Sequence, residues 1–297
     1  MHRVFVTGAT GFVGRAVVSA LRAHGHIVRC LVRRGSERQL RGMEAIERVE
    51  GDILLGQDLA AHMTGCDAVI HLVGIIRERA PRTSFELLHR QGTVNVVEAA
   101  VAAGIHRYLH MSALGTRPGA PSRYHQTKWA AEEAVRGSGL AWTIFRPSVI
   151  YGKGDGFVTL LARMVERLPA VPVIGSGRHR LQPVPVEQVA EGFARALARP
   201  TAEKQTYEVG GARPLTMLEL LDLIGRALGR SRVRKILVPL AVMRPLARVL
   251  HLLPGFPVTP DQLLMLEEDH ACDPAPFLSA FGLEPADPAV GIARMLA

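Results

Sequence analysis

The chain has 297 residues, of which 48% are hydrophobic and 5% aromatic. This length is sufficient for one large α/β domain, or for a nucleotide-binding domain with a smaller second one, around a substantial core. The three cysteines are scattered and odd in number, which excludes a disulfide framework and indicates a reduced, cytoplasmic protein. The net charge of +9 comes mainly from dispersed arginines. Because so few aromatic residues accompany them, we expect no nucleic-acid partner.

Neither a targeting segment nor a metal site is predicted. Residues 1–3 lead directly into an apolar strand pattern, without the longer apolar region of a signal peptide. The twelve histidines form no H-E-x-x-H pattern and no cluster with cysteine. We therefore interpret them as isolated core or surface residues and expect no metal.

The first motif is a glycine-rich turn that follows the apolar run 4–7. Gly8, Gly11 and Gly14 are spaced as G-x-x-G-x-x-G, and residues 16–21 continue with a helical pattern. In a dinucleotide-binding turn the first glycine permits the tight turn, the second admits the pyrophosphate, and the third lets the helix pack on its strand. We predict such a cradle here, and a plain strand-turn-helix is the alternative.

Apolar strand-like runs alternate with helical patterns along the chain, which is typical of βαβ units. Right-handed crossovers between these units predict an α/β fold with a doubly wound parallel sheet. We predict a nucleotide-binding domain at 1–150 and a smaller, interleaved C-terminal lobe at 151–297, from which 181–200 returns to the first domain. Further strands are predicted at 27–32, 46–49, 68–72, 108–111, 142–145 and 181–184, and helices at 85–103, 122–137, 157–168 and 217–228.

Residues that follow the predicted strands indicate which dinucleotide binds. Arg33 and Arg34 follow the second strand, where an NAD-binding protein usually has an acid. A guanidinium pairs well with a 2′-phosphate, so NADP(H) is favoured over NAD(H); ordinary loop charges are the alternative. Asp52 is placed to accept from the adenine amino group. Gly74 lets the backbone pass close to the cofactor.

Tyr124 and Lys128 are four residues apart on a predicted helix, which places them on one face. An ammonium beside a phenol, together with the positive nicotinamide, is expected to lower the phenol pKa toward the working range of an acid or base. Ser112, at the end of the fifth strand, is placed to hold a substrate carbonyl or hydroxyl against the phenol. These three residues are the predicted catalytic set, and a solvated helix face is the alternative for the pair.

In their order along residues 1–200, the motifs resemble those of the extended, atypical short-chain dehydrogenase/reductase family. Within this family the sequence is most similar to the NADPH-binding accessory-subunit group of respiratory complex I. The resemblance is carried by residues 7–14, 51–53, 92–100, 111–115, 124–128 and 146–152, and toward the accessory-subunit group by 69–76 and 256–263. It implies a Rossmann domain that binds NADP(H). The predicted cofactor contacts are Gly8, Thr10, Gly11, Phe12, Val13, Arg33, Arg34, Asp52, Ile53, Leu72, Val73, Gly74, Lys128, Pro147 and Val149.

The resemblance leaves two functions open. The first is an oxidoreductase that transfers hydride between NADP(H) and a carbonyl or hydroxyl, with Tyr124 as acid or base, Lys128 on the ribose and Ser112 on the substrate. The second is a non-catalytic assembly or redox-sensing subunit. Only twelve positions separate Ser112 from Tyr124, fewer than in most extended members, and Gln188 replaces an expected acid. The resemblance therefore implies cofactor binding more directly than turnover.

The segment 236–253 is rich in large apolar residues, but two arginines and two prolines interrupt it. This composition excludes a transmembrane span. If 246–253 is helical, Arg244, Arg248 and His251 form a basic stripe beside an apolar face. Three interpretations remain: contact with a membrane surface or a respiratory complex, the wall of a pocket for a quinone- or isoprenoid-like substrate, or packing on the lobe's own core. The first would place the protein at the inner face of the membrane.

Overall fold

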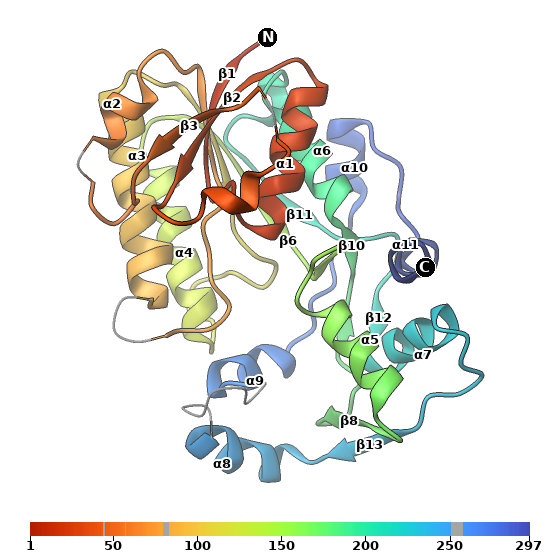
Figure 1. Cartoon of the computed structure of the whole chain (residues 1–297). Coiled ribbons are helices and arrows are strands. Elements are labelled where there is room, and N and C mark those ends of the chain that lie inside the picture. The colour runs from red at the N-terminus through yellow and green to blue at the C-terminus, as the bar shows by residue number, and fades with distance from the viewer. Residues whose placement is uncertain (44, 57, 80–82, 251–257) are drawn as a thin grey trace.

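The computed structural model describes residues 1–43, 45–56, 58–79, 83–250 and 258–297. Its centre is a seven-stranded sheet in the order β11-β6-β5-β4-β1-β2-β3 (Figure 1), and every neighbouring pair is parallel. The strands are β1 Arg3–Thr7, β2 Ile27–Val32, β3 Glu47–Glu50, β4 Ala68–His71, β5 Arg107–Met111, β6 Ala141–Pro147 and β11 Gln205–Val209. The predicted doubly wound α/β fold is confirmed, and β11 is an addition to it. The carboxyl ends of all seven strands lie at one edge of the sheet.

Both faces of this sheet are covered by helices, so its central strands are apolar on both sides. Successive residues of β1 show this, because Val4 and Val6 pack into one core and Phe5 into the other. The first core includes residues of α1 Phe12–Ala23, α6 Val186–Ala196 and α10 Ala275–Phe281. The second is covered by α2 Leu59–Met63, α3 Gly92–Ala102 and α4 Arg123–Arg136.

One predicted helix differs in its geometry. The segment 85–103 is a π-helix, η2 Glu86–Gln91, that continues into α3. π-helical turns are rare in proteins, and those that occur are often found at functional sites. This turn places the His89 side chain inside the protein.

The rest of the described chain builds a second region with its own core (Figure 1). The helices are α5 Val158–Arg167, α7 Met217–Ala227 and α11 Pro288–Leu296, and short paired strands join them: β7 Ile150–Tyr151 with β10 Val184–Pro185, β8 Val171–Ile174 with β13 Lys235–Val238, and β9 Arg180–Leu181 with β12 Leu215–Thr216. The strand predicted at 181–184 is thus two short pieces, because β9 and β10 pair with different partners. The domain division at residue 150 stays a prediction.

The helix predicted from residue 246 begins earlier, as α8 Leu240–Leu250. It packs on α9 Pro260–Leu266 through Met243, Ala247 and Leu263. The predicted contributions of 251–253, including His251, and of Phe256 and Pro257 lie outside the described residues. Within the described ranges, no helix has the length and apolar character needed to cross a bilayer.

Candidate functional site

The turn between β1 and α1 has the geometry of a phosphate-binding cradle. Gly8 has a φ of +77° and its carbonyl accepts a 3.0 Å hydrogen bond from the amide of Gly11. A β-carbon on Gly14 would lie 2.1 Å from the Gly8 carbonyl oxygen, so α1 can pack here only with glycine. No side chain caps α1, and its first turn holds no acidic residue. The first amides of the helix are therefore available to an anion.

The outer part of the cradle is open. Gly11 is exposed, and a β-carbon there would meet only the Gly8 carbonyl oxygen, at 3.2 Å. Thr10, Phe12 and Val13 beside it are half-buried. Among the described residues, no side chain fills the space beyond Gly11, and the pyrophosphate contact of this second glycine stays a prediction.

The ends of β2 and β3 hold the predicted adenosine contacts. Arg33 and Arg34 are exposed, and their side chains have no bonding partner among the described residues. One Asp52 carboxylate oxygen accepts from the amide of Leu54 at 3.0 Å, which makes an Asx turn and leaves the other oxygen for a ligand. Ile53 is buried, and its carbonyl accepts from the Asn95 amide at 2.7 Å.

The end of β4 brings a predicted cofactor loop to Lys128. The Leu72 amide donates to the Thr7 carbonyl at 3.1 Å, which continues the sheet. Val73 is half-buried, and Gly74 is exposed. A β-carbon on Gly74 would lie 3.0 Å from Lys128 Nζ. Gly74 thus permits a close approach between its own backbone and the ammonium.

The ends of β5 and β6 place the remaining candidates. The Ser112 amide donates to the Phe145 carbonyl at 2.8 Å, and its hydroxyl to Thr116 Oγ1 at 3.3 Å. The Pro147 carbonyl accepts from the amide of Leu114, and the Val149 carbonyl from that of Val184, both at 2.9 Å. These backbone groups of Ser112, Pro147 and Val149 are therefore hydrogen-bonded within the fold, and the side chains of the three residues remain to face a ligand.

Tyr124 and Lys128 lie in the first turns of α4, which begins at the Ser122 cap. Lys128 is 2% exposed, and its ammonium donates to the Met111 carbonyl at 2.9 Å, next to Ser112. The Tyr124 ring is packed edge-to-face against Phe85, His89 and His125. Its hydroxyl makes no hydrogen bond to Ser112 or Lys128, although all three residues are described. The structure thus brings Lys128 to the strand ends and leaves the phenol without a side-chain partner there.

A carboxylate from the second region holds the start of α4. Asp261, on α9, accepts from the amides of Arg123 at 2.7 Å and Tyr124 at 3.1 Å. These amides belong to the first turn of α4, which lacks intrahelical partners. Sequence reasoning missed this residue because its partners are 137 and 138 positions away.

The pKa values of the pair do not follow the prediction. Burial, and after it the negative charge of Asp261, raises the pKa of Tyr124 to about 12. Burial lowers the pKa of Lys128 to about 8, against the opposing effect of Glu132. For the protein groups alone, the predicted lowering of the phenol pKa is wrong, because the desolvation of the phenolate dominates. At neutral pH the phenol is protonated.

A buried hydrogen-bond network connects the cradle to α4. His71 Nδ1 accepts from the hydroxyl of Thr7 at 2.6 Å, and Nε2 donates to Thr93 Oγ1 at 3.1 Å. His89 Nε2 accepts from the Ile75 amide at 3.1 Å, and Nδ1 donates to Thr127 Oγ1 at 3.0 Å. We assign these tautomers because the hydroxyls of Thr93 and Thr127 already donate to backbone carbonyls and can only accept from the rings. The network requires both rings to be neutral.

Burial, and after it the Lys128 charge, lowers the pKa of His71 to about 3 and that of His89 to about 2. His110 stacks on His71 with a 5.5 Å centroid separation, and burial lowers its pKa well below the usual range. Sequence reasoning treated these histidines as isolated. The one signal for His71 was its position as the polar residue at the end of an apolar strand.

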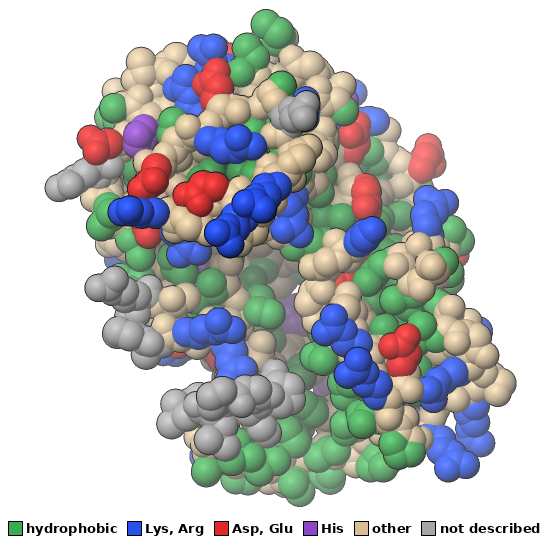
Figure 2. Space-filling view, in the orientation of Figure 1, with side chains coloured by type: hydrophobic (Ala, Val, Ile, Leu, Met, Phe, Trp, Pro, Cys, Tyr) green, Lys and Arg blue, Asp and Glu red, His purple; other side chains and the backbone are tan. Residues whose placement is uncertain are grey.

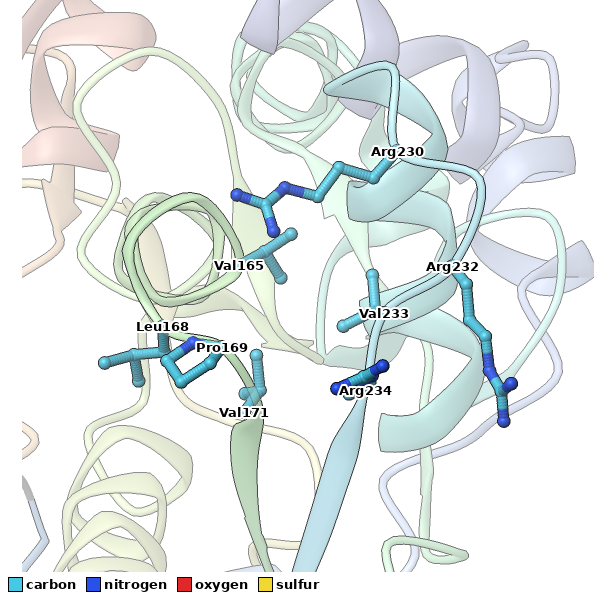
Figure 3. A pocket seen from close by; sticks show the side chains of 8 residues that line it. All are labelled: Val165, Leu168, Pro169, Val171, Arg230, Arg232, Val233 and Arg234. Carbon is cyan, nitrogen blue, oxygen red and sulfur yellow. The ribbon is translucent and has the colours of Figure 1, made fainter.

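Two cavities of the described structure lie outside the predicted site and are lined by other residues. One of about 180 Å³ lies between the end of α5 and the start of β13, and Figure 3 shows Arg230 reaching over Val165 there. Another lies beyond β2, lined by Glu37, Arg38, Arg41 and Arg48. Neither includes Tyr124. Among the described residues, no group of three or more histidine, cysteine or acidic side chains is placed to hold a metal ion.

Comparison with protein families gives one match that covers most of the chain. The family described as NAD(P)H-binding matches residues 8–200. This range includes the cradle, the ends of β2 to β6, and the Tyr124–Lys128 pair. It therefore contains every residue predicted to contact the cofactor or to take part in catalysis.

Relatives of known name include respiratory subunits and reductases. The 40 kDa subunit of mitochondrial NADH-ubiquinone oxidoreductase from Neurospora crassa is 27% identical over 96% of this chain and 76% of its own. The ceramide reductase of Caulobacter vibrioides is 36% identical over 63% of this chain and 58% of its own. The 4-hydroxy-2-methyl-3-oxo-4-farnesyl-3,4-dihydroquinoline-1-oxide ketoreductase of Stigmatella aurantiaca is 30% identical over 75% of this chain and 72% of its own.

A solved structure shares the fold across the whole chain. UDP-glucose 4-epimerase of Thermotoga maritima, solved with UDP-glucose, superposes with a TM-score of 0.77. The match covers 99% of this chain and 97% of the epimerase, at 18% identity. Together the comparisons confirm the family resemblance predicted from the motifs, including its complex I branch.

Proposed function

Because the chain belongs to the NAD(P)H-binding family of Rossmann proteins, we propose that it is an NADP(H)-dependent oxidoreductase acting on a carbonyl or hydroxyl of a lipophilic substrate. One observation carries the proposal. The Tyr124–Lys128 pair lies at the same sheet edge as an uncapped, glycine-lined cradle, with the Lys128 ammonium bonded at the end of β5. This combination provides a cofactor site and a proton donor side by side.

The cofactor would be held from both ends. The amides of the first turn of α1 would bind the pyrophosphate, and Arg33 and Arg34 a 2′-phosphate. Both arginines are exposed and unpaired within the described chain, so they are available for that phosphate. Asp52 would accept from the adenine amino group, and Lys128 would donate to the ribose hydroxyls.

The chain's own residues would move and hold the proton. When bound, NADPH supplies a hydride to the carbonyl carbon. Burial raises the pKa of Tyr124 to about 12, so the phenol is protonated at neutral pH and can donate its proton to the carbonyl oxygen. Ser112 donates a hydrogen bond to the same oxygen after turning from Thr116. The Lys128 ammonium stabilises the phenolate that remains.

The lipophilic substrate is supported by two observations. Two of the relatives are named for a ceramide and for a farnesyl-bearing dihydroquinoline oxide. In this chain the phenol ring packs edge-to-face against the rings of Phe85, His89 and His125, which line its surroundings with aromatic surface. We therefore place long-chain ketones, prenylated quinones and isoprenoid carbonyls before sugars as substrates.

A second function is favoured by a different observation. A relative that is similar over 96% of this chain is a respiratory subunit, and the Tyr124 phenol makes no hydrogen bond to Ser112 or Lys128. An NADPH-binding assembly or redox-sensing subunit would need the cradle but not the proton donor. The two functions differ in turnover and not in cofactor binding.

The experiment that separates them follows NADPH oxidation with the carbonyl classes above, dispersed in detergent, and with sugars as comparison. We expect oxidation with at least one lipophilic carbonyl. The matched control is Gly11→Val, in which a branched side chain fills the pyrophosphate space, so its oxidation should fall to background. Bound NADPH without oxidation by any carbonyl class would contradict the oxidoreductase and favour the subunit.

A further inference from the structure

A surface far from the cradle combines exposed aliphatic side chains with unpaired arginines. We call it the β13–α8 face, and it consists of Arg232, Arg234, Ile236, Val242, Leu246 and Val249. Ile236 and Val249 are 59% and 71% exposed. Hydrophobic side chains gather along the lower edge of the molecule in the orientation of Figure 1, where α8 and β13 lie (Figure 2).

The outward side of α8 is apolar for most of its width. Val242, Leu246 and Val249 follow a helical spacing of four and three, and each is at least 40% exposed. On the inward side, Met243 and Ala247 are buried against α9. A surface helix that is apolar on both sides has an outward face without a partner in its own fold.

The chain segment that forms this face carries charged residues of one sign. Residues 226–250 contain seven basic residues and no acidic one: Arg226, Arg230, Arg232, Arg234, Lys235, Arg244 and Arg248. Lys235 pairs with Asp222 and Arg244 with Glu267, both from outside this segment. Arg232 and Arg234 are exposed and have no ion-pair partner in the described part of the chain. Figure 3 shows Arg232 extending away from α5 and from Arg230.

We propose that the β13–α8 face binds the surface of an anionic lipid bilayer, with its aliphatic residues among the acyl chains and Arg232 and Arg234 on the headgroups. Both chemical components of the face match such a surface. A second copy of the chain fits less well, because a two-fold contact would bring two basic segments together. A protein partner also fits less well, because residues 226–250 contain no aromatic anchor.

The same packing links this face to the proposed active site. Leu263 of α9 packs on α8, and Asp261 of α9 accepts from the amides of Arg123 and Tyr124. In Figure 1, α9 lies between α8 and the start of α4. Bilayer binding would therefore bring the Tyr124 end of α4 toward the membrane, where a lipophilic substrate is dissolved. This orientation rests on the proposed function, whereas bilayer binding itself does not.

The test is flotation of the full chain with vesicles of phosphatidylcholine alone and of phosphatidylcholine with about one third phosphatidylglycerol. We expect the protein to float with the anionic vesicles and to be released by high salt. Two double variants separate the components: Val242→Asp with Val249→Asp, and Arg232→Glu with Arg234→Glu. Each should lower the bound fraction at least about tenfold.

Matched controls alter exposed residues away from this face. Val290→Asp, on α11, changes a valine that is 58% exposed, and Arg22→Glu, on α1, reverses an exposed arginine. Both should bind like the parent. Equal binding to the two kinds of vesicle, no binding, or equal losses in controls and variants would overturn the proposal. So would self-association that Val242→Asp with Val249→Asp abolishes.

The NADPH-dependent rise in melting temperature is measured on every variant. An unchanged rise shows that the fold and the cradle are intact. A protein that binds vesicles but oxidises no substrate would contradict the proposed function and keep this inference. A protein that oxidises a substrate but does not bind vesicles would contradict only the inference.

Discussion

Gly11 and Gly14 differ in what a side chain would meet, although both belong to the same motif. At Gly14 a β-carbon would lie 2.1 Å from the Gly8 carbonyl oxygen, inside the fold. At Gly11 the nearest atom is the same oxygen at 3.2 Å, and the residue is exposed. The fold therefore requires glycine at position 14, whereas at position 11 we propose that the ligand requires it.

This difference gives a prediction for two variants. Gly11→Val should melt within a few degrees of the parent but gain no stability from NADPH, because the side chain occupies the pyrophosphate space. Gly14→Val should not fold stably, because its β-carbon overlaps backbone atoms. Melting scans with and without NADPH measure both. A normal NADPH-dependent shift in Gly11→Val would mean that the glycines serve the fold alone.

In the proposed site, Arg33 would contribute to a preference for NADPH. Arg33→Ala should weaken NADPH binding by about 1–3 kcal/mol and leave NADH binding nearly unchanged, because only NADPH carries the 2′-phosphate. Calorimetry with both cofactors measures this, and Arg22→Ala on α1 is the control for loss of one exposed arginine. Equal affinities of the parent for NADPH and NADH would contradict the assignment.

At the scale of elements, β4, η2 and α4 are joined by neutral buried histidines, and this makes their packing sensitive to acid. The folded pKa values of His71 and His89, about 3 and about 2, lie below the ordinary value of 6.5. As the pH falls, these two histidines therefore bind protons in the unfolded chain before they do so in the folded protein. Stability is full above pH 6.5 and is lost as the pH drops from there toward 3, by about 1.4 kcal/mol per pH unit for each histidine.

Denaturant unfolding between pH 7 and pH 4.5 tests this account. The free energy of unfolding of the parent should fall steeply below pH 6.5. His71→Gln should be less stable at pH 7 but should lose stability less steeply, because one of the titrating rings is absent. Replacement of exposed His106 provides the comparison, since its side chain is outside the network. A slope that does not change in His71→Gln would contradict the role of this ring.

The elements of the sheet were predictable because their signal is local. Apolar runs and the spacing of glycines define β1 to β6, and the residues after each strand identify the ligand edge. The π-helix at Glu86–Gln91 has no comparable signal, since its i to i+5 bonding depends on the fit of His89 and Phe85 into the core. The contact of Asp261 with α4 also joins positions far apart in the chain, and only the folded arrangement shows it.

The contact of Asp261 with the start of α4 gives a prediction about stability. Asp261→Ala should destabilise the chain by about 0.5–2 kcal/mol, because two amides at the start of α4 lose their acceptor. Asp261→Asn should retain part of this stability, since its amide oxygen can still accept. Thermal unfolding of the two variants compares them. If both match the parent, the two hydrogen bonds do not stabilise the start of α4.

At the scale of the whole molecule, the chain combines a confirmed Rossmann fold with a second region whose β13–α8 face has no partner in the fold. Composition suggested three interpretations of residues 236–253. The structure shows that one side of α8 packs on the protein's own core and that the other side faces outward. Met243 and Ala247 pack on α9, while Val242 and Val249 face outward. Sequence periodicity alone does not determine which of two apolar sides is covered.

If Tyr124 donates the proton during hydride transfer, as we propose, loss of its hydroxyl should sharply reduce turnover and leave cofactor binding intact. The parent and Tyr124→Phe are compared for NADPH binding by calorimetry and for NADPH oxidation with the best lipophilic carbonyl. We predict that the variant binds NADPH nearly as the parent does and that its turnover falls by about 10²–10⁴, because the ring remains and only the proton donor is lost. Oxidation at the parent's rate in Tyr124→Phe would contradict the claim.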